Sequence, residues 1–361
     1  MARLFSTFFL SICCVISLFA TNSAPASTQM KIDKITGQLA NPWGMTLIDN
    51  KHILVTLRAG QLVQISLSSG IATPVGNLPD IVSKGQGGLL DILYHKGEVF
   101  LCYSAPQSGR NTATSVLRAR LNNNQLTDRK QIFTSNFSDS NGYHFGCRMV
   151  IKNETLYLSV GERNERDTAQ DGTLHSGAII GISLSDNMPL TPARPDWAAG
   201  ILSKGHRNPQ GMAIHPDTQE IWVHEHGPRG GDEINIFTAG ANYGWPITSF
   251  GREYYGAKIG KGITSAPGIT DPVWHWTPSI APSGMAFYTG DMFDFKGHLL
   301  VGSLKFRSLY LVTLKDNRPS SETVLLKNKI GRIRDVEIAP DGAILLLSDE
   351  TDGGLYRLSR P

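Results

Sequence analysis

Residues 335–359 contain the pattern that decides the fold. They read Asp335-Val-Glu-Ile-Ala-Pro-Asp-Gly342, then Ile344-Leu-Leu-Leu-Ser-Asp349, then Gly354-Leu-Tyr-Arg-Leu-Ser359. The runs are short and rich in leucine or β-branched side chains, and glycine or aspartate separates each run from the next. That is the pattern of β-strands joined by tight turns. The unit therefore predicts strands of one small antiparallel sheet.

The same unit recurs five times upstream. Its openings are Trp43-Gly-Met-Thr-Leu-Ile48, Gly88-Leu-Leu-Asp-Ile-Leu93, Arg148-Met-Val-Ile151, Gly211-Met-Ala-Ile-His-Pro216 and Gly284-Met-Ala-Phe-Tyr288. No long stretch has the 3.6-residue apolar period of a helix, so the predicted fold class is all-β. Six units, each about as long as a four-stranded sheet with its loops, predict a six-bladed β-propeller, because stacked blades bury each other's faces. A pair of stacked β-sandwiches is the alternative architecture.

The segment that begins Lys31-Ile-Asp-Lys-Ile35 is predicted to add a strand to the last blade. Such a strand would fasten the ring and leave no terminal sheet face open. Long loops are expected at one end of the propeller axis, because loops of this length usually exist for a functional site. The longest predicted loops are residues 104–114, 122–147, 162–177, 185–210 and 238–283.

The first 26 residues have the pattern of a secretory signal peptide. Arg3 supplies a positive start, Leu4 to Ala20 is an apolar run, and Ala24-Pro25-Ala26 fits a small-residue cleavage site. The run is shorter than the ~18–20 apolar residues that span a membrane. We therefore expect a periplasmic or secreted protein without membrane insertion, in which residues 27–361 form a single propeller domain.

The net charge of the chain limits the kinds of molecule that it is expected to bind. The net charge is +3, and removal of Arg3 with the leader leaves 3 − 1 = +2. A balance this close to neutral argues against nucleic acid or an anionic membrane as the main partner.

Two cysteines, Cys102 and Cys147, remain after the leader. An oxidising compartment permits a disulfide between them, but their spacing alone does not decide whether they pair.

One stretch concentrates glycine, proline and acidic residues between two strands. It reads His224-Glu-His-Gly-Pro-Arg-Gly-Gly-Asp-Glu-Ile-Asn235 and is followed by Asn242-Tyr-Gly-Trp-Pro246. Carboxylates and exposed carbonyls together are the ligands that calcium prefers. An ordinary turn is the alternative, in which Asp232 and Glu233 form a solvated acidic pair. His224 and His226, two apart on a strand, would also suit zinc, but no third ligand has a convincing spacing.

Four cationic side chains occur at equivalent points of the repeats: Arg207, Lys305, Arg332 and Arg334. If they face the axis they converge on one small volume, where cations without matching acids imply an anionic ligand. Side chains two apart on a strand share a face, which places Arg332 beside Arg334. Surface charges that never meet are the alternative.

Together these motifs resemble the soluble pyrroloquinoline quinone (PQQ)-dependent sugar dehydrogenases, in particular the bacterial periplasmic aldose sugar dehydrogenases. The resemblance spans roughly residues 35–359. Its motifs, in order, are His144-Phe-Gly146, Arg207-Asn-Pro-Gln-Gly211, His226-Gly-Pro-Arg-Gly-Gly-Asp-Glu-Ile-Asn235, Asn242-Tyr-Gly-Trp-Pro246, Ala281-Pro-Ser-Gly-Met285, Lys305 and Arg332-Ile-Arg-Asp335. It implies a PQQ- and calcium-dependent monomer or homodimer that oxidises aldose sugars to lactones and passes electrons to an external acceptor.

The resemblance also implies residue roles. His144 would be the general base that takes the proton of the anomeric hydroxyl as hydride passes to the quinone, since its ordinary pKa of ~6.5 lies near the working pH. Arg207 would stabilise charge on the reduced oxygen. The residues implied to bind the cofactor are Gln86, Arg207, Asn208, Lys305, Arg332 and Arg334. The carbonyls of Gly227 and Pro228 would hold a calcium ion that polarises the quinone, and Glu233 and Tyr243 would belong to a second, structural calcium site.

Some positions depart from the family pattern. Cys147 replaces the glycine that usually follows His-Phe-Gly, Ala178 and Gly181 replace a common lysine and arginine, and His224 has no role to assign. Structural alternatives also stay open. A turn histidine that caps a strand is the alternative for His144, and Trp274 and Trp276 would either stack on the quinone or fill the core.

Two functions of other classes fit a propeller. One is a propeller that binds a sugar or a protein without turnover, because fold does not dictate function. The other is a calcium-dependent lactone hydrolase, which would need several carboxylates on an axial metal, whereas the predicted pocket is cationic. The sequence has no Gly-x-Ser-x-Gly elbow, phosphate loop or dinucleotide fingerprint.

Overall fold

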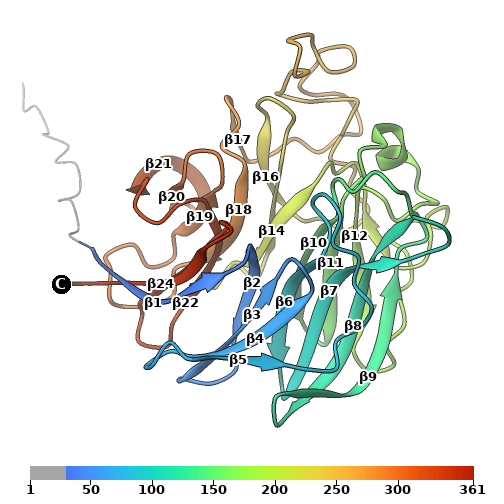
Figure 1. Ribbon diagram of the computed structural model, residues 1–361. Coiled ribbons are helices and arrows are strands. Elements are labelled where there is room, and N and C mark those ends of the chain that lie inside the picture. Colours follow the sequence, from blue (N-terminus) through green and yellow to red (C-terminus); the bar gives the residue numbers. More distant parts are fainter. Residues whose placement is uncertain (1–29) are drawn as a thin grey trace, which may run out of the picture.

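The computed structural model describes residues 30–361, which form six four-stranded antiparallel sheets around one axis (Figure 1). The predicted all-β, six-bladed propeller is therefore confirmed. The predicted leader, residues 1–26, lies outside the described residues. Between Met30 and Pro361 there is no helix long and apolar enough to cross a membrane.

The first five blades use consecutive strands. Blade 1 is β2 (Pro42–Leu47), β3 (His52–Leu57), β4 (Gln61–Ser66) and β5 (Ala72–Val75). Blade 2 is β6 (Leu89–His95), β7 (Glu98–Pro106), β8 (Thr112–Asn122) and β9 (Gln125–Thr134). Blade 3 is β10 (Gly146–Lys152), β11 (Thr155–Val160), β12 (Ala178–Ser183) and β13 (Ile201–Ser203), with the short 3-10 helix η1 (Arg166–Gln170) after β11. Blade 4 is β14 (Pro209–Ile214), β15 (Ile221–Glu225), β16 (Asp232–Ile236) and β17 (Trp274–Trp276). Blade 5 is β18 (Pro282–Phe287), β19 (Leu299–Ser303), β20 (Ser308–Lys315) and β21 (Arg318–Lys327).

The sixth blade joins the two ends of the described chain. It consists of β22 (Ile333–Ile338), β23 (Ile344–Ser348), β24 (Gly353–Ser359) and β1 (Lys31–Leu39). Strand β1 pairs antiparallel with β24, from Lys31 opposite Ser359 to Leu39 opposite Gly353. The inner strand β22 also packs against β2 of blade 1, so the ring is closed as predicted.

Several outermost strands lie where the sequence predicts loops. Strand β9 falls inside the predicted loop 122–147, β13 inside 185–210 and β17 inside 238–283, so those loops are shorter than predicted. The predicted loop 104–114 is a turn of five residues, 107–111, between β7 and β8. The connection between β16 and β17 is the long one, and it projects from one end of the molecule (yellow to light orange in Figure 1).

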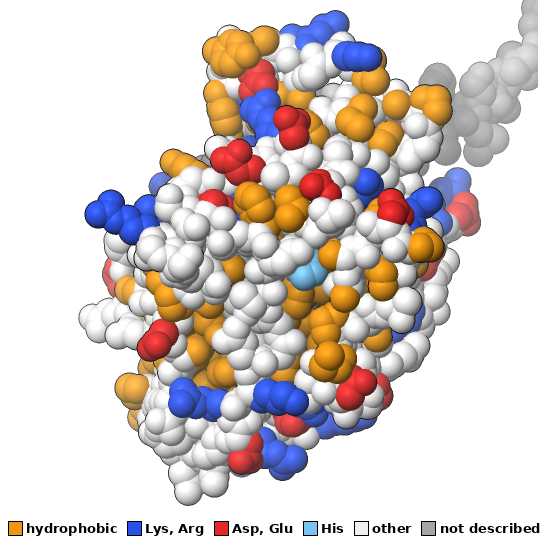
Figure 2. All heavy atoms as spheres, turned by 90° about the vertical axis from the view of Figure 1, so that its right-hand side faces the viewer, with side chains coloured by type: hydrophobic (Ala, Val, Ile, Leu, Met, Phe, Trp, Pro, Cys, Tyr) orange, Lys and Arg blue, Asp and Glu red, His pale blue; other side chains and the backbone are white. Residues whose placement is uncertain are grey.

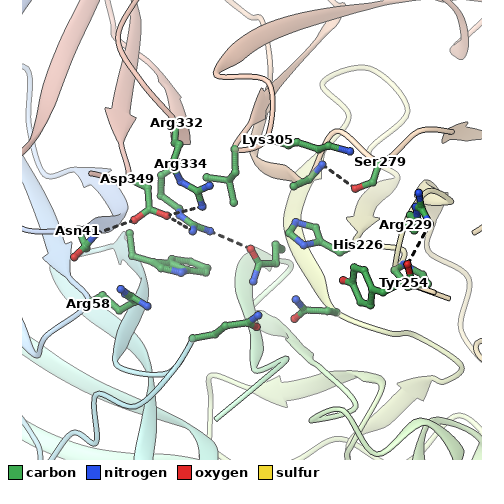
Figure 3. A pocket seen from close by; sticks show the side chains of 17 residues that line it. Asn41, Arg58, His226, Arg229, Tyr254, Ser279, Lys305, Arg332, Arg334 and Asp349 are labelled. Atoms are coloured by element: carbon green, nitrogen blue, oxygen red, sulfur yellow. Dashed lines mark hydrogen bonds and ion pairs between the residues drawn. The ribbon is translucent and has the colours of Figure 1, made fainter. Parts of the chain in front are cut away.

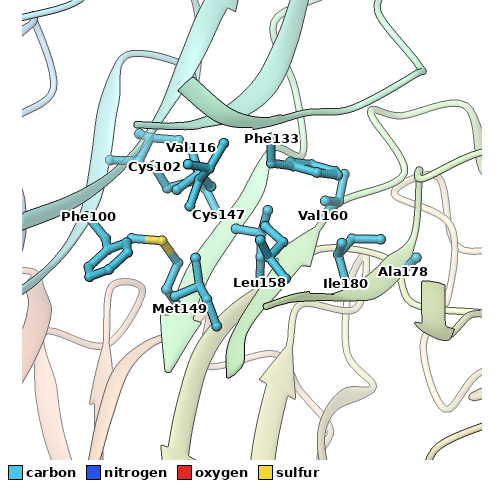
Figure 4. Close-up of a cluster of buried hydrophobic side chains, with 14 of the residues drawn as sticks. Phe100, Cys102, Val116, Phe133, Cys147, Met149, Leu158, Val160, Ala178 and Ile180 are labelled. Carbon is cyan, nitrogen blue, oxygen red and sulfur yellow. A yellow bond between two sulfur atoms is a disulfide. The ribbon is translucent and has the colours of Figure 1, made fainter. Parts of the chain in front are cut away.

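The two cysteines form a disulfide between blades 2 and 3. Cys102 lies on β7 and Cys147 on β10, with their Cα atoms 5.7 Å apart. Both are fully buried in a cluster with Phe100, Val116 and Met149 (Figure 4). Closing a loop of 45 residues lowers the entropy of the unfolded chain and stabilises the fold by about 4 kcal/mol in the chain-entropy account. The pairing that the sequence left open is thereby resolved.

A buried charged triad fills part of the axis. The Arg148 Nη1 atom on β10 lies 2.9 Å from Asp91 Oδ1 on β6 and 3.0 Å from Asp335 Oδ1 on β22. The second carboxylate oxygens accept hydrogen bonds from the backbone of Met149 (2.8 Å) and Met45 (2.9 Å). Burial raises the pKa of Asp91 to about 7, although Arg148 opposes the shift. The triad ties together the inner strands of four blades beneath the site described next.

One face of the molecule shows how charges are distributed on the outer surface (Figure 2). On the face drawn in Figure 2, lysine and arginine side chains are interspersed with aspartate and glutamate. This mixture agrees with the near-neutral net charge of the sequence.

Candidate functional site

A cavity of about 780 Å³ is formed by residues of five blades and of the loops beside them (Figure 3). Its cationic lining residues are Arg58, Arg229, Lys305, Arg332 and Arg334. Among residues 30–361, the one acidic side chain in the lining is that of Asp349. A concave surface with this excess of cations favours an anionic ligand.

Arg332, Arg334 and Asp349 form one side of the cavity. The Asp349 Oδ2 atom lies 2.5 Å from Arg334 Nη2 and 3.5 Å from Arg332 Nη2. Burial alone would raise the pKa of Asp349, but the two guanidinium groups outweigh it and hold that pKa below its ordinary value. Arg334 also donates to Gln210 Oε1 at 3.0 Å, and its buried Nε atom has no hydrogen-bond partner within residues 30–361. The guanidinium groups of Arg332 and Arg334, which line the cavity, are suited to a carboxylate.

The other predicted cofactor residues lie around the same cavity. Lys305 follows β19, and within the described part of the chain its ammonium has no ion-pair partner. Asn208 accepts a hydrogen bond from the Gly146 backbone at 3.1 Å, and Gln86 accepts one from the His144 backbone at 2.9 Å. Both side chains therefore connect the cavity to the segment that carries His144.

His144 is buried behind Gln86 and is paired with an acid. Its Nδ1 atom lies 2.6 Å from Glu162 Oε2, which also accepts a hydrogen bond from the Asn164 backbone at 2.8 Å. Burial lowers the pKa of His144 and outweighs the opposing effect of the hydrogen bond that Nδ1 donates to Glu162, and the charge of Arg207 lowers the pKa further. A neutral imidazole that donates from Nδ1 keeps its Nε2 lone pair for accepting a proton.

His144 lies in the irregular segment that leads into β10. It precedes β10 with a φ of +46°. Its ring, however, is engaged by Glu162 of the loop after β11 and is not used to cap a strand. His144 itself does not line the large cavity, whereas Gln86 and Asn208, which contact its segment, do.

Arg207 lies apart from the other three predicted cations. It lines a second, much smaller cavity together with Glu225, Gly227, Glu233 and Tyr243. Its Nη1 atom donates to the carbonyls of His226 (3.0 Å) and Gly227 (3.4 Å). The structure thus brings Lys305, Arg332 and Arg334 to one cavity and places Arg207 at its neighbour. The carbonyl side of Gly227 faces Arg207, while Pro228 lines the large cavity.

The smaller cavity contains an acid pair. Glu225 and Glu233 are cross-strand partners on β15 and β16, and both are buried. Burial, followed by the charge of Glu225, raises the pKa of Glu233 well above its ordinary value. Within residues 30–361 no three His, Cys, Asp or Glu side chains are grouped to hold a metal. Two carboxylates among hydroxyl and carbonyl oxygens nevertheless suit calcium, which accepts main-chain ligands.

Asp232 anchors the loops between the two cavities. Its carboxylate accepts hydrogen bonds from the Gly227 backbone (2.8 Å), the Ser279 hydroxyl (2.7 Å) and the Ile280 backbone (2.7 Å). Asp232 and Glu233 are both buried, so the alternative of a solvated acidic turn is wrong.

The remaining candidates are structural. His226 Nε2 donates to the Pro282 carbonyl at 2.5 Å, and burial lowers its pKa to about 3. His224 is fully buried, and neither ring nitrogen has a hydrogen-bond partner in the described residues. Trp276 is buried in a core cluster with Ile234, and Trp274 packs against the same cluster, so both belong to the core.

Two residues of the site escape the sequence motifs. Glu162 follows the strand Thr155–Val160, and Asp349 follows Ile344–Ser348. In both cases the available signal was an acidic residue within two positions of the end of a largely buried strand. Aspartate and glutamate also end many strands as ordinary turn residues, so this signal alone does not single them out.

The chain is similar to known sugar dehydrogenases over nearly its whole length. The family model described as "Glucose / Sorbosone dehydrogenase" matches residues 39–357. An aldose sugar dehydrogenase of Escherichia coli (strain K12) is 35% identical over 370 residues, which cover 98% of each chain. The crystal structure of the soluble aldose sugar dehydrogenase from Escherichia coli, in the apo-form, superposes with a TM-score of 0.88 at 34% identity, covering 92% of this chain and 100% of that one. The quinoprotein glucose dehydrogenase B of Acinetobacter calcoaceticus is 24% identical over 404 residues, covering 87% of this chain and 83% of that one.

Proposed function

Because this chain belongs to the glucose/sorbosone dehydrogenase family and is a sugar-oxidising oxidoreductase, we propose that it is a PQQ- and calcium-dependent aldose dehydrogenase that forms lactones. The observation that carries the proposal is the convergence of Lys305, Arg332 and Arg334 on one cavity with a single acid. The name of the quinoprotein relative supports the same cofactor.

The large cavity fits a quinone that carries three carboxylates. Lys305, Arg332 and Arg334 line the cavity and would bind the carboxylates with their cationic groups. Gln86 and Asn208 would contact the same molecule from blades 2 and 4. When bound, PQQ supplies the two-electron oxidising power, which amino-acid side chains lack.

His144 would act as the base for the anomeric hydroxyl. Its lowered pKa keeps the imidazole neutral at working pH, and Glu162 fixes the proton on Nδ1. Nε2 is then the atom that accepts the substrate proton, and Glu162 stabilises the imidazolium that results. Arg207, beside this pair, would stabilise negative charge near the reaction.

Calcium would bind at two places. One place would be the carbonyls of Gly227 and Pro228, in the loop held by the Asp232 anchor, where Pro228 lines the large cavity and Gly227 the small one. Glu233 and Tyr243 line the small cavity, where the raised pKa of Glu233 marks an acid pair that a divalent cation would neutralise.

The proposed setting is the periplasm. The leader-like residues 1–26 support export, and the disulfide is compatible with an oxidising compartment. Residues 27–361 would form the mature domain, as a monomer or homodimer that passes electrons to an external acceptor.

The proposal is tested by mixing purified apoprotein with PQQ, calcium, glucose and an artificial dye acceptor. Dye reduction that requires both PQQ and sugar supports it. PQQ binding without dye reduction on any aldose would favour a propeller that binds without turnover. Lactone hydrolysis without PQQ binding would instead favour the hydrolase.

Replacing Lys305 with methionine is expected to weaken PQQ binding roughly 10- to 150-fold, because a charge-assisted hydrogen bond contributes about 1.5–3 kcal/mol. The dissociation constant is measured by titrating PQQ into the apoprotein at fixed calcium. The dependence of the PQQ dissociation constant on salt concentration should also decrease, because one ion pair that salt screens is lost. The control is Lys329→Met, an exposed lysine outside the cavity, which should bind PQQ like the wild type. Equal dissociation constants for the wild type and Lys305→Met would contradict this assignment.

Replacing Glu162 with glutamine is expected to lower kcat about tenfold, because the amide still accepts the Nδ1 proton but no longer stabilises the imidazolium. Glu162 raises the pKa of His144, so its loss moves the acid limb of the pH–rate profile to lower pH. Profiles of kcat from pH 4 to 9 check both effects. The exposed Glu165→Gln variant should match the wild type. An acid limb that moves to higher pH would refute the pairing.

A further inference from the structure

We propose that the disulfide between Cys102 and Cys147 positions His144 for proton transfer, which makes Cys147 a positioning residue. The inference rests on the proposed role of His144 as the base. Cys147 directly follows the His-Phe-Gly motif, at a position where the family pattern has glycine.

The backbone around His144 is left-handed at three of four positions. The φ angles are +46° at His144, +64° at Gly146 and +72° at Cys147. Glycine reaches this region freely, whereas L side chains do so rarely and at an energetic cost. At Gly146 a side chain is also excluded by space, because a Cβ atom there would lie 2.7 Å from the Gly161 nitrogen. Cys147 has no such steric need for glycine, but its φ angle has to be maintained by its surroundings.

Strand pairing does not maintain the left-handed φ angle of Cys147. Gly146 pairs with Val160, and the next paired residue of β10 is Met149, opposite Leu158. Cys147 and Arg148 therefore form a bulge opposite Ser159. Arg148 is held by its own contacts, a hydrogen bond from its backbone to Ser159 Oγ (2.9 Å) and the axial triad. The side chain of Cys147 is bonded to Cys102 of blade 2 and packed in the buried cluster with Phe100 and Met149. A bulge of this kind changes the direction of the chain that precedes it.

The chain before the bulge is held between blades 2 and 3. From the blade 2 side, Gln86 accepts from the His144 backbone (2.9 Å), and Thr114 donates to the Phe145 carbonyl (2.9 Å). Cys102, on the neighbouring strand β7, adds the covalent link. On the blade 3 side, Glu162 binds the His144 ring at 2.6 Å. The disulfide thus ties the chain to blade 2 three residues after His144, while Glu162, which follows β11 of the same blade 3, holds the His144 ring.

The test compares two double variants that both lack the crosslink. Cys102→Ala/Cys147→Ala keeps a side chain at the left-handed position, whereas Cys102→Ala/Cys147→Gly supplies the residue that adopts this φ freely. We expect kcat, at saturating PQQ, calcium and sugar, to fall about tenfold in the alanine pair. The glycine pair should recover to within about twofold of the wild type. Both pairs should unfold at lower temperature than the wild type, because both lose the crosslink.

A second readout does not depend on turnover. In ¹⁵N-histidine-labelled apoprotein, the Nδ1–H proton shared with Glu162 should give a downfield signal, assigned by its absence in His144→Ala. The signal should be lost or shifted in the alanine pair and restored in the glycine pair. A disulfide that only stabilises the fold would leave both the signal and kcat unchanged below the unfolding temperature.

Three outcomes overturn the inference: wild-type kcat in the alanine pair, equal losses of kcat in both pairs, or failure of both pairs to fold. The last would mean that the disulfide is needed for the fold as a whole. If the wild-type protein oxidises no aldose, the proposed function fails, while the NMR signal still decides whether the disulfide positions His144.

Discussion

Replacing His144 with alanine is expected to lower kcat by about 10²–10⁴-fold, which is the usual contribution of a general base. The PQQ dissociation constant should stay near that of the wild type, because His144 lies behind Gln86 and does not line the large cavity. Dye reduction at saturating PQQ, calcium and glucose measures kcat, and direct titration of the apoprotein with PQQ measures the dissociation constant. A partly exposed histidine at the start of β3, His52, provides the control variant His52→Ala. A kcat within twofold of the wild type in His144→Ala would exclude this histidine as the base.

The pH profile of the wild type gives an independent check. Burial lowers the pKa of His144 from 6.5, so the free enzyme holds the neutral, proton-accepting form down to a pH below 6.5. The acid limb of kcat/KM should therefore appear below pH 6.5 and should disappear in His144→Ala. An acid limb above pH 7 would mean that another group controls the rate.

Replacing Arg148 with methionine is expected to lower the free energy of unfolding by about 3–5 kcal/mol, because it leaves Asp91 and Asp335 buried at the axis without their cation. Carboxylates that are buried without a cation bind protons, because the neutral form avoids the cost of a buried charge. Their folded-state pKa is therefore raised further. A folded state that binds more protons than the unfolded state loses stability as the pH rises. The loss should consequently be larger at pH 8 than at pH 5 in urea denaturation.

Two comparisons isolate the axial triad. The exposed Arg120→Met variant removes a cation 3.9 Å from Asp128 at the surface and should change stability by less than about 1 kcal/mol. Combining Arg148→Met with Asp91→Asn and Asp335→Asn removes the unpaired charges and keeps oxygen acceptors for Met149 and Met45. This triple variant should be more stable at pH 8 than Arg148→Met alone. A smaller stability than that of Arg148→Met would show that unpaired charge is not the cause.

The second strand of each blade was predictable because it lies inside the sheet and is largely buried on both faces. Strand β23 (Ile344–Ser348) is entirely buried, and it begins with a continuous apolar run, Ile344-Leu-Leu-Leu347. The outer strands differ in this respect. Strand β21 (Arg318–Lys327) exposes most of its side chains, and β5 (Ala72–Val75) exposes three of four. Their sequences carry no apolar period, and only pairing with the preceding strand makes them β.

The site was predictable where its residues lie in contiguous motifs. Arg332 and Arg334 meet at Asp349 because they are two apart at the start of one strand. The partner acids were not predictable, since Glu162 and Asp349 are brought to His144 and Arg334 only by the packing of strands within a blade. The direction of the Arg207 side chain was not predictable either. Its motif was clear, but its hydrogen bonds to the carbonyls of His226 and Gly227 turn it toward the smaller cavity.

The most direct measurement is a crystal structure of the protein reconstituted with PQQ and calcium. The account predicts that the quinone occupies the large cavity, with carboxylates bound by Lys305, Arg332 and Arg334, and that the reactive end lies toward His144. PQQ bound elsewhere, or a cavity that stays empty at a PQQ concentration saturating in solution, would contradict it.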